Sequence, residues 1–339
     1  MTKQFLFKYK ITHPIKRWLT QILDAVLNFI FIRKAISYKE PHKLLIIRLD
    51  NLGDILLTRP LVYSLKKAYP QVSIDILLSK ESVNILKFDS WITNIFFINK
   101  ETITQLKNNR YDLIIEPKGR LDYAWLTYKL KPNFSIGFGD AGGRAFFNEA
   151  LYQIDQNPIE KNKQICNKLN ITYNANFPDI NVGDTLLEPF QKYSSFILIM
   201  PFSSRKEKDW SGDNYLHLIT ALKKSNIKVV VAGEFSRKED FSAFINCANI
   251  ELFSSEQLYH LVALIKSVKL LVGPDSAPIH IAAAVRTNTL SLYLKEAPSI
   301  WHHYKEEDGH YVLHSPTKEI TVEDVEIKIL SILGEDFGK

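Results

Sequence analysis

Residues 43–69 read KLLIIRLDNLGDILLTRPLVYSLKKAY, and the periodicity of the apolar residues changes within this stretch. The run 44–49 is apolar and branched, which is typical of a buried strand. A short polar turn follows at 50–54, and the segment 60–69 then has the apolar spacing of an amphipathic helix. A buried strand followed by such a helix predicts the first half of a βαβ unit in a parallel sheet.

The same alternation continues along the chain in two series. Further strands are predicted at 73–79, 95–99, 111–116 and 134–138, and a second series at 196–202, 227–233, 250–253, 269–273 and 289–294. Amphipathic stretches such as 213–225 separate them. Two series of this kind predict an α/β protein with two doubly wound, Rossmann-like domains, which the length of 339 residues accommodates.

The domain boundaries follow from composition. The least regular stretch, 174–195, contains Pro178, Gly183 and Pro189 and is predicted to be the linker. One domain is therefore placed at 41–180 and the other at 190–320. A C-terminal helix is predicted within 321–339, with Thr321 as its cap and Asp324 three residues on.

The remaining segment, residues 1–40, is a basic N-terminal arm. It holds eight Lys and Arg side chains against Asp24 and Glu40, so its net charge of +6 equals that of the whole chain. The folded part is thus balanced in charge, which argues against a nucleic-acid partner. The two cysteines, Cys166 and Cys247, predict neither a disulfide framework nor a metal site and fit a reducing cytoplasm.

Residues 14–34 have the pattern of an amphipathic helix. Apolar side chains from Trp18 to Ile30 form one stripe, while Asp24 and Asn28 are predicted on the opposite side. The apolar stretch is too short to span a bilayer and lacks a signal-peptide cleavage site. Two interpretations stay open: a helix lying on an anionic membrane surface, or a helix packed on the first domain. The first would make the protein peripheral on the inner face of the cytoplasmic membrane.

Ligands of open parallel sheets bind beyond the carboxyl ends of the strands. After the strand 44–49 come Asn51, Gly53 and Asp54. The Asp54 carboxylate could act as a general base on a hydroxyl, with Asn51 beside the acceptor. The alternative is that Asp54 only caps the helix that begins near Pro60.

Three further candidates follow strands of the second series. Ser203, Ser204 and Lys208 can hold a diphosphate, unless their loop is merely solvated. Glu234 can accept hydrogen bonds from a ribose or a base. The sequence GPDSAPIH, 273–280, turns from a strand into a helix whose free N–H groups suit phosphate. Its candidate donor-binding residues are Asp275, Ser276, Ala277 and His280.

Other polar residues give weaker signals. Lys118, Arg120 and Arg144 could bind acidic groups of an acceptor or form surface salt bridges. The GFGDAG sequence at 137–142 lacks the helix that a dinucleotide site requires. His302 and His303, with nearby acidic residues, have no spacing typical of a metal site. No metal and no cofactor are therefore predicted.

Four ordered segments resemble a known family. They are KLLIIRLDNLGDILLTRPLVYSLKKAYP, YDLIIEPKGR, SSRKEKDW and LLVGPDSAPIHIAAAVRTNTLSLY. Over about residues 43–320 they resemble the ADP-heptose:lipopolysaccharide heptosyltransferases, glycosyltransferase family 9. The resemblance implies a GT-B fold, with two Rossmann-like domains facing a cleft. It also implies an inverting, metal-independent sugar transfer, with ADP-heptose as the expected donor and a lipid-linked envelope saccharide such as the lipopolysaccharide core as acceptor.

The resemblance also implies roles for individual residues. It makes Asp54 the catalytic base, and it places Ser204, Lys208, Asp275, Ser276 and His280 on the phosphates and the sugar. Glu234 matches an acid on the nucleotide side. The chain departs from the family pattern at Ala277, where glycine is usual, and at 295–298, where the family often has a Gly-Pro-Thr loop. A nucleotide-sugar epimerase and a non-catalytic sugar-nucleotide-binding protein are the alternatives.

Overall fold

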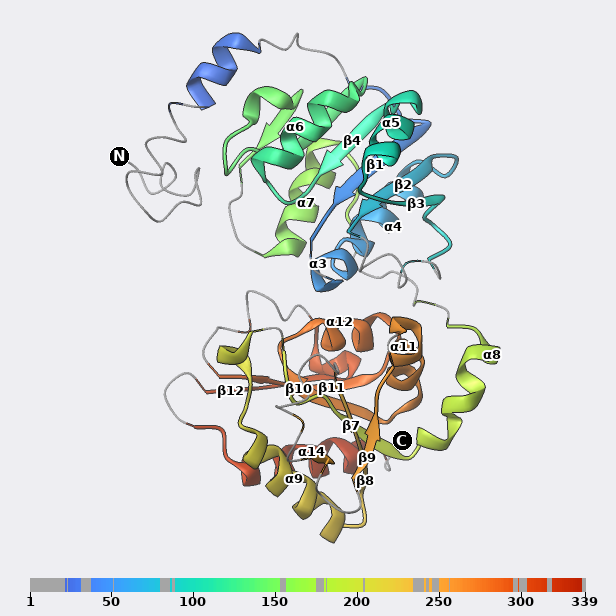
Figure 1. Cartoon of the computed structure of the whole chain (residues 1–339), viewed down its shortest axis with the longest axis vertical. Coiled ribbons are helices and arrows are strands. Elements are labelled where there is room, and N and C mark those ends of the chain that lie inside the picture. Colours follow the sequence, from blue (N-terminus) through green and yellow to red (C-terminus); the bar gives the residue numbers. More distant parts are fainter. Residues whose placement is uncertain are drawn as a thin grey trace. The chain divides into compact units, whose positions relative to one another are not determined.

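The computed structural model describes most of the chain, which divides into two compact units, Met1–Pro178 and Asp179–Lys339 (Figure 1). The described residues are 22, 24–31, 38–50, 52–79, 86, 89–152, 157–174, 180, 182–203, 205–233, 241, 244–245, 250–255, 257–294, 298, 304–315 and 319–336.

The first unit is built on a six-stranded sheet in the order β3-β2-β1-β4-β5-β6, with every pair parallel. Its strands are β1 (Lys43–Arg48), β2 (Ser73–Leu78), β3 (Asn94–Phe97), β4 (Leu113–Glu116), β5 (Phe134–Phe138) and β6 (Glu149–Leu151). Its helices are α3 (Leu52–Leu56), α4 (Arg59–Ala68), α5 (Lys100–Asn108), α6 (Leu121–Leu130), the short η3 (Arg144–Phe146) and α7 (Pro158–Lys168). The chain leaves β1 in one direction for β2 and β3 and returns to its other side for β4, so the strand order reverses between β1 and β4.

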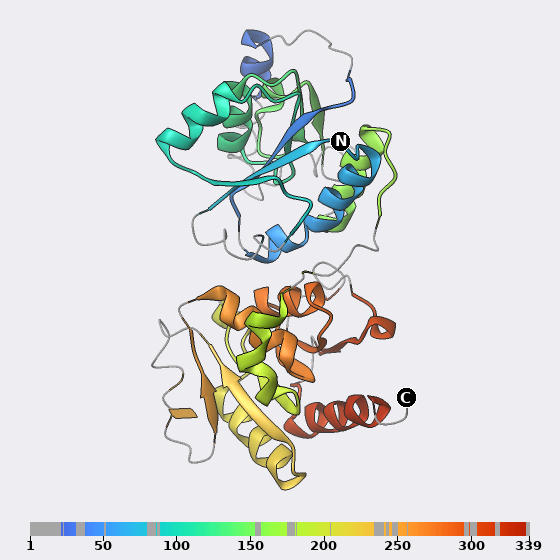
Figure 2. The same cartoon turned by 90° about the vertical axis from the view of Figure 1, so that its right-hand side faces the viewer.

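The second unit repeats this topology with the order β12-β11-β10-β7-β8-β9, again parallel throughout. Figure 2 shows each unit turned by 90° from the view of Figure 1. The strands of the second unit are β7 (Phe196–Ile199), β8 (Lys228–Ala232), β9 (Glu251–Phe253), β10 (Leu270–Pro274), β11 (Asn288–Tyr293) and β12 (His310–His314). Its helices are α8 (Asp184–Leu187), η4 (Glu188–Tyr193), η5 (Lys206–Lys208), α9 (Gly212–Lys224), α11 (Leu258–Ser267), α12 (Ala277–Ala284), η7 (Glu306–Asp308) and α14 (Val322–Asp336). Here the order reverses between β7 and β10.

The two doubly wound sheets confirm the predicted α/β class, and each predicted strand is present within a few residues. The central strands were the easiest to predict, because Leu44 to Ile47 of β1 are completely buried and read as one apolar run. Sequence reasoning missed β6 and β12. Both lie at sheet edges and are mostly half-buried, so they lack the continuous apolar run of a central strand.

Two predicted boundaries need correction. Part of the predicted linker, α8 and η4, is helical, and Phe190 and Tyr193 are buried with their rings against Phe253 of β9. This part belongs to the second unit. The C-terminal helix α14 is also part of that unit's core, where it contributes Val325, Ile329 and Ile332.

The predicted cap of the C-terminal helix is confirmed. Thr321 Oγ1 accepts a hydrogen bond from the N–H of Asp324 at 3.1 Å, and Asp324 Oδ2 accepts one from the N–H of Thr321 at 3.0 Å. The two side chains therefore satisfy each other's backbone donors at the helix start.

The N-terminal helix packs on the first unit through one of its faces. Of the predicted 14–34 segment, the structure describes a helix at 24–30, with Ile22 also helical, and the following Phe31. Leu27 and Phe31 pack against a cluster formed by α6 and η3. Asp24, predicted on the polar face, is instead buried, because its carboxylate accepts a hydrogen bond from the N–H of Arg144 at 3.2 Å. Among the helices of the described residues, none is long and apolar enough to cross a membrane.

Candidate functional site

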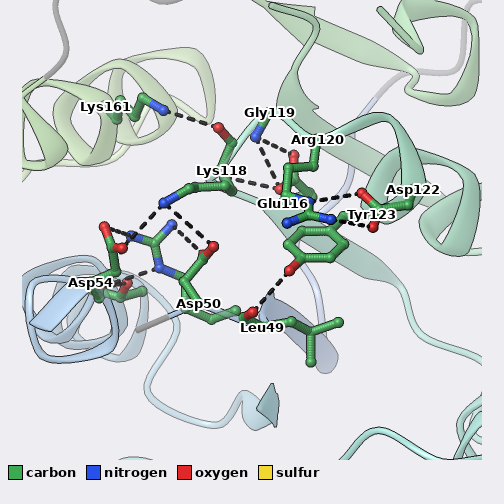
Figure 3. A network of polar contacts seen from close by, with 12 residues as sticks. Leu49, Asp50, Asp54, Glu116, Lys118, Gly119, Arg120, Asp122, Tyr123 and Lys161 are labelled. Atoms are coloured by element: carbon green, nitrogen blue, oxygen red, sulfur yellow. Dashed lines mark hydrogen bonds and ion pairs between the residues drawn. The ribbon is translucent and has the colours of Figure 1, made fainter. Parts of the chain in front are cut away.

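The first candidate site lies where the strand order of the first unit reverses. Arg48 ends β1, Asp54 lies on α3 directly after it, and Lys118 follows β4. Lys118 Nζ lies 3.1 Å from Asp54 Oδ2 and 3.4 Å from Asp50 Oδ1. Arg48 Nη2 lies 3.2 Å from Asp54 Oδ1. Figure 3 shows Lys118 reaching over both carboxylates, so two strands that neighbour each other supply the two sides of one charged cluster.

Asp54 does not cap the following helix. The N-terminal cap of α4 is Thr58, and the Asp54 carboxylate points instead to the two cations. Burial by itself would raise the pKa of Asp54, but the charges of Arg48 and Lys118 outweigh burial and lower it. Asp54 is therefore an ionised carboxylate at neutral pH, the state that a proton acceptor requires.

A buried carboxylate below this cluster fixes the turn that carries Lys118. Glu116, the last residue of β4, is completely buried and accepts hydrogen bonds from the N–H groups of Lys118 and Gly119, at 3.0 and 2.8 Å. Gly119 has a φ of +86°, and a Cβ there would lie 2.9 Å from the Cβ of Phe138, so only glycine fits. The buried Lys161 of α7 donates to the carbonyl of Lys118 at 3.1 Å. These contacts determine where the Lys118 side chain begins.

Glu116 should make the stability of the protein depend on pH. Burial raises its pKa from 4.5 to about 7, against the opposing effect of the hydrogen bonds from Gly119 and Lys118. Because the folded value is the higher one, Glu116 favours the folded state below about pH 4.5, and this contribution is lost as the pH rises through about 7. The full difference corresponds to roughly 3 kcal/mol. Glutamine stays neutral, so the Tm of Glu116→Gln minus the Tm of wild type should increase as the buffer changes from mildly acidic to mildly alkaline. The expected increase is roughly 5 °C or more.

Thermal melts of both proteins across this pH range test the expectation, with Glu101→Gln on the exposed start of α5 as the control. A Tm difference that stays constant with pH would mean that Glu116 remains ionised in the folded protein and that its backbone hydrogen bonds outweigh burial.

The other predicted acceptor residues have their described contacts elsewhere than with Asp54. Arg120 is exposed and makes a two-pronged contact with Asp122, at 2.9 and 2.7 Å, as a surface salt bridge would. The Arg144 guanidinium lies over the ring of Tyr152, while its backbone N–H binds the N-terminal helix. Asn51 lies outside the described residues. Of the predicted acceptor side chains, the described contacts bring only Lys118 to Asp54.

The second candidate site occupies the equivalent place in the second unit. Lys208 lies on η5 in the connection after β7, and Asp275 directly follows β10. Lys208 Nζ lies 2.5 Å from Asp275 Oδ2, and the two side chains are only 15% and 7% exposed. A lysine–aspartate pair thus lies where the strand order reverses in this sheet too, with the partners exchanged between the two strands.

Each residue of the Lys208-Asp209-Trp210 sequence has its own contact. Asp209 Oδ1 accepts the N–H of Ser203 at 2.6 Å, and the buried Trp210 ring donates through Nε1 to the carbonyl of Ile320 at 3.0 Å. The Ser203 hydroxyl donates to the carbonyl of Arg205 at 2.8 Å. The loop is therefore closed on itself and anchored in the core, not merely solvated. Ser204 and Glu234 lie outside the described residues.

The start of α12 gathers the remaining predicted donor residues. Ser276 is the cap residue, and its hydroxyl donates to the carbonyl of Pro274 at 3.1 Å instead of to the helix N–H groups. Ala277 is the first helical residue, and the buried His280 has its Nδ1 2.8 Å from the hydroxyl of Tyr304. Because the Ser276 hydroxyl donates to Pro274, it does not cap the N–H groups in the first turn of α12. An anion site at a helix start uses these N–H groups.

A family model for glycosyltransferase family 9 (heptosyltransferase) matches residues 100–329, more than half of the chain. The chain belongs to glycosyltransferase family 9.

Individual relatives agree with this assignment. The lipopolysaccharide core heptosyltransferase OpsX of Haemophilus influenzae is 24% identical over 282 residues, covering 76% of this chain and 80% of the relative. Lipopolysaccharide heptosyltransferase 3 of Escherichia coli is 26% identical over 273 residues, covering 71% and 80%. The structure of the E. coli ADP-heptose lps heptosyltransferase II matches with a TM-score of 0.75 at 19% identity, covering 87% of this chain and 99% of that one. The fold is GT-B, as the resemblance implied.

Family membership makes this protein a glycosyltransferase. Several residues that contact the two sites were not predicted from the sequence as site residues. They are Arg48, Asp50, Glu116, Lys161, Asp209 and Tyr304. Arg48 and Glu116 did carry a signal, because each is a charged residue at the end of an apolar strand and must find a partner when buried.

Among the described residues, no group of three or more His, Cys, Asp and Glu could hold a metal ion, and His302 and His303 lie outside them.

Proposed function

We propose that this glycosyltransferase transfers a heptosyl group from ADP-heptose to the lipopolysaccharide core or a related lipid-linked envelope saccharide. The observation that carries the proposal is the Asp54 carboxylate, held ionised by Arg48 and Lys118 directly after β1. The relatives support it by their names, since two are lipopolysaccharide heptosyltransferases and a third is an ADP-heptose lps heptosyltransferase.

Asp54 is the general base of the proposed reaction. It removes the proton of the acceptor hydroxyl as that oxygen bonds to the anomeric carbon of the donor sugar. The bond from this carbon to the diphosphate oxygen breaks, ADP leaves, and the configuration at the carbon is inverted. Arg48 and Lys118 keep the carboxylate in place, and they make it a weak base that works best when the hydroxyl is already positioned.

Lys208 and the start of α12 bind the donor in this proposal. The ammonium group of Lys208 faces the growing negative charge of the leaving diphosphate, and the first turn of α12 adds N–H groups and a partial positive charge. Asp275 keeps the lysine side chain ordered until the donor arrives. Ser203, Ser204, Ser276, Ala277 and His280 complete the donor site, and Glu234 contacts the nucleoside.

The proposed reaction needs no metal ion, because Lys208 supplies the positive charge that a divalent cation supplies in other transferases. Turnover should therefore be unchanged, within about twofold, when the enzyme is assayed in excess EDTA. The measurement is the rate of ADP release with and without chelator. Loss of activity in EDTA that Mg²⁺ or Mn²⁺ restores would contradict metal independence.

The identity of the donor and of the reaction is tested with purified protein. A thermal-shift screen of ADP-, GDP-, UDP- and dTDP-sugars should give the largest stabilisation with ADP-heptose, since a ligand of the folded state raises Tm by mass action. Incubation with that donor and a lipopolysaccharide-core fragment should yield the extended saccharide. Conversion of the donor without an acceptor would favour an epimerase, and binding without turnover on any envelope acceptor would favour a binding protein.

A lipid-linked acceptor lies at the membrane, so the proposal includes attachment to the inner face of the cytoplasmic membrane through residues 14–34. The +6 charge of the arm supports this part of the proposal.

A further inference from the structure

The N-terminal helix is held on the first unit by a specific set of contacts. The carboxylate of the buried Asp24 accepts a hydrogen bond from the N–H of Arg144 at 3.2 Å. The ring of Phe31 lies 5.3 Å from that of Tyr128 and 5.3 Å from that of Phe146, both edge-on. Buried polar and aromatic contacts of this kind fix the rotation of the helix about its axis.

That rotation leaves an apolar face exposed. Ile22, Val26, Phe29 and Ile30 lie on it, and Phe29 and Ile30 are 83% and 61% exposed. We define these four residues as the outer face. The spacing of three and four residues between them places them on one side of the helix. Large apolar side chains grouped in this way on a surface are typical of an interaction site.

The surroundings of the outer face resemble a membrane interface. Trp125 of α6 contacts Phe31, is 37% exposed, and has the ammonium of Lys129 5.0 Å from its ring. An exposed tryptophan beside a lysine is common where a protein meets lipid headgroups. The arm of residues 1–40, to which the helix belongs, carries the entire net charge of the chain, +6. A neutral apolar partner would not account for this charge, whereas an anionic bilayer matches both the charge and the apolar face.

We propose that the outer face is a membrane-docking surface, on which Phe29 and Ile30 insert among the lipids of an anionic bilayer while the opposite face stays bound to α6 and η3. This deepens the membrane attachment in the proposed function by naming the face that enters the lipid. It also predicts that the attachment is rigid, because the helix stays docked on the catalytic unit.

The test uses the full-length chain and flotation with vesicles of phosphatidylcholine, with or without phosphatidylglycerol. Wild type should bind the vesicles that contain phosphatidylglycerol, and less strongly at high salt. Phe29→Ser/Ile30→Ser should bind them about tenfold more weakly or worse, since two large apolar side chains lose their burial in lipid.

The matched control is Ile327→Ser/Leu330→Ser on α14, whose side chains are 60% and 42% exposed in the second unit. This variant likewise replaces two exposed apolar side chains by serine on another helix, and it should bind vesicles as wild type does. Tm and activity on a soluble acceptor fragment should be unchanged in Phe29→Ser/Ile30→Ser, because the exposed side chains contribute little to the fold. Vesicle binding without transferase activity would count against the proposed transferase function but not against membrane docking by the outer face.

Three outcomes would overturn the proposal. The first is equal vesicle binding by wild type and the outer-face variant, and the second is an equal loss in the α14 control. The third is that wild type ignores vesicles and forms a dimer that Phe29→Ser/Ile30→Ser dissociates in sedimentation, which would mean that a second copy covers the face.

Discussion

Asp54→Asn is expected to lower kcat by about 100-fold or more while leaving donor affinity nearly unchanged. The substitution keeps the shape of the side chain but removes its ability to accept a proton. Lys118 and Arg48 lie 3.1 and 3.2 Å from the two different oxygens of Asp54, and the amide oxygen of asparagine can still accept a hydrogen bond from one of these two cations. Steady-state kinetics of ADP release, together with a binding titration for the donor, measure the two quantities separately.

The matched control for this experiment is Asp50→Asn. Asp50 contacts the same two cations, with Arg48 at 3.4 Å and Lys118 at 3.4 Å, so both substitutions remove one negative charge from one cluster. If Asp54 is the base, Asp50→Asn should reduce kcat far less. Equal losses in the two variants would mean that only the charge balance of the cluster matters. A drop in Tm with full specific activity in Asp54→Asn would mean that Asp54 is structural.

Asp54→Asn should also change the acid side of the stability profile. The folded-state pKa of Asp54 is lowered, so its ionised form stabilises the fold above the ordinary aspartate pKa, and this contribution is lost as the pH falls through the lower, folded value. Kinetic assays therefore belong near neutral pH and well below the Tm of both variants.

The sequence predicted the strands of the two sheets better than it predicted how the loops pack against them. A strand such as β1 is buried on both faces and reads as one apolar run, so it needs no knowledge of its neighbours. The strand β12 has His310 and His314 at its ends and is half-buried between them, which hides it from a search for apolar runs. The predicted linker 174–195 contains the division between the two units but extends too far, because its prolines and glycine suggested irregular chain at 184–193, where aromatic packing on β9 decides the structure.

The site residues follow the same division between local and tertiary information. Asp54 and Asp275 were found because each follows a strand, and this depends only on sequence order. That Asp54 meets Lys118, 64 positions further on, depends on β1 and β4 being neighbours, which periodicity does not reveal. The burial of Asp24 could not be predicted either, since its partner is a backbone N–H of residue 144.

The two units use one arrangement twice. In the first, the strand order reverses between β1 and β4, and an aspartate after β1 meets a lysine after β4. In the second, it reverses between β7 and β10, and a lysine after β7 meets an aspartate after β10. The shared topology explains why both pairs form, because neighbouring parallel strands end at the same edge of the sheet. The difference is in exposure: the Lys118 side chain is 34% exposed and Lys208 is 15% exposed.

Lys208→Ala is expected to lower kcat/KM for the donor on the order of 10²-fold, mostly through a higher KM. The lysine is largely buried, so its charge acts on a bound diphosphate with little screening by water. The substitution also leaves Asp275, 7% exposed, without its lysine partner, and should cost about 3 kcal/mol of unfolding free energy. Lys206→Ala, on the exposed side of the same short helix η5, is the control and should change neither quantity appreciably.

A double variant separates the two effects of Lys208. In Lys208→Met/Asp275→Asn the unpaired buried charge is gone, so most of the lost stability should return. Donor binding should not return, because the cation that faces the diphosphate is still missing. Chemical unfolding curves and donor titrations on the two single variants, the double variant and wild type complete the cycle. If donor affinity recovers together with stability in the double variant, Lys208 only supports the loop through Asp275, and the diphosphate is held by other groups.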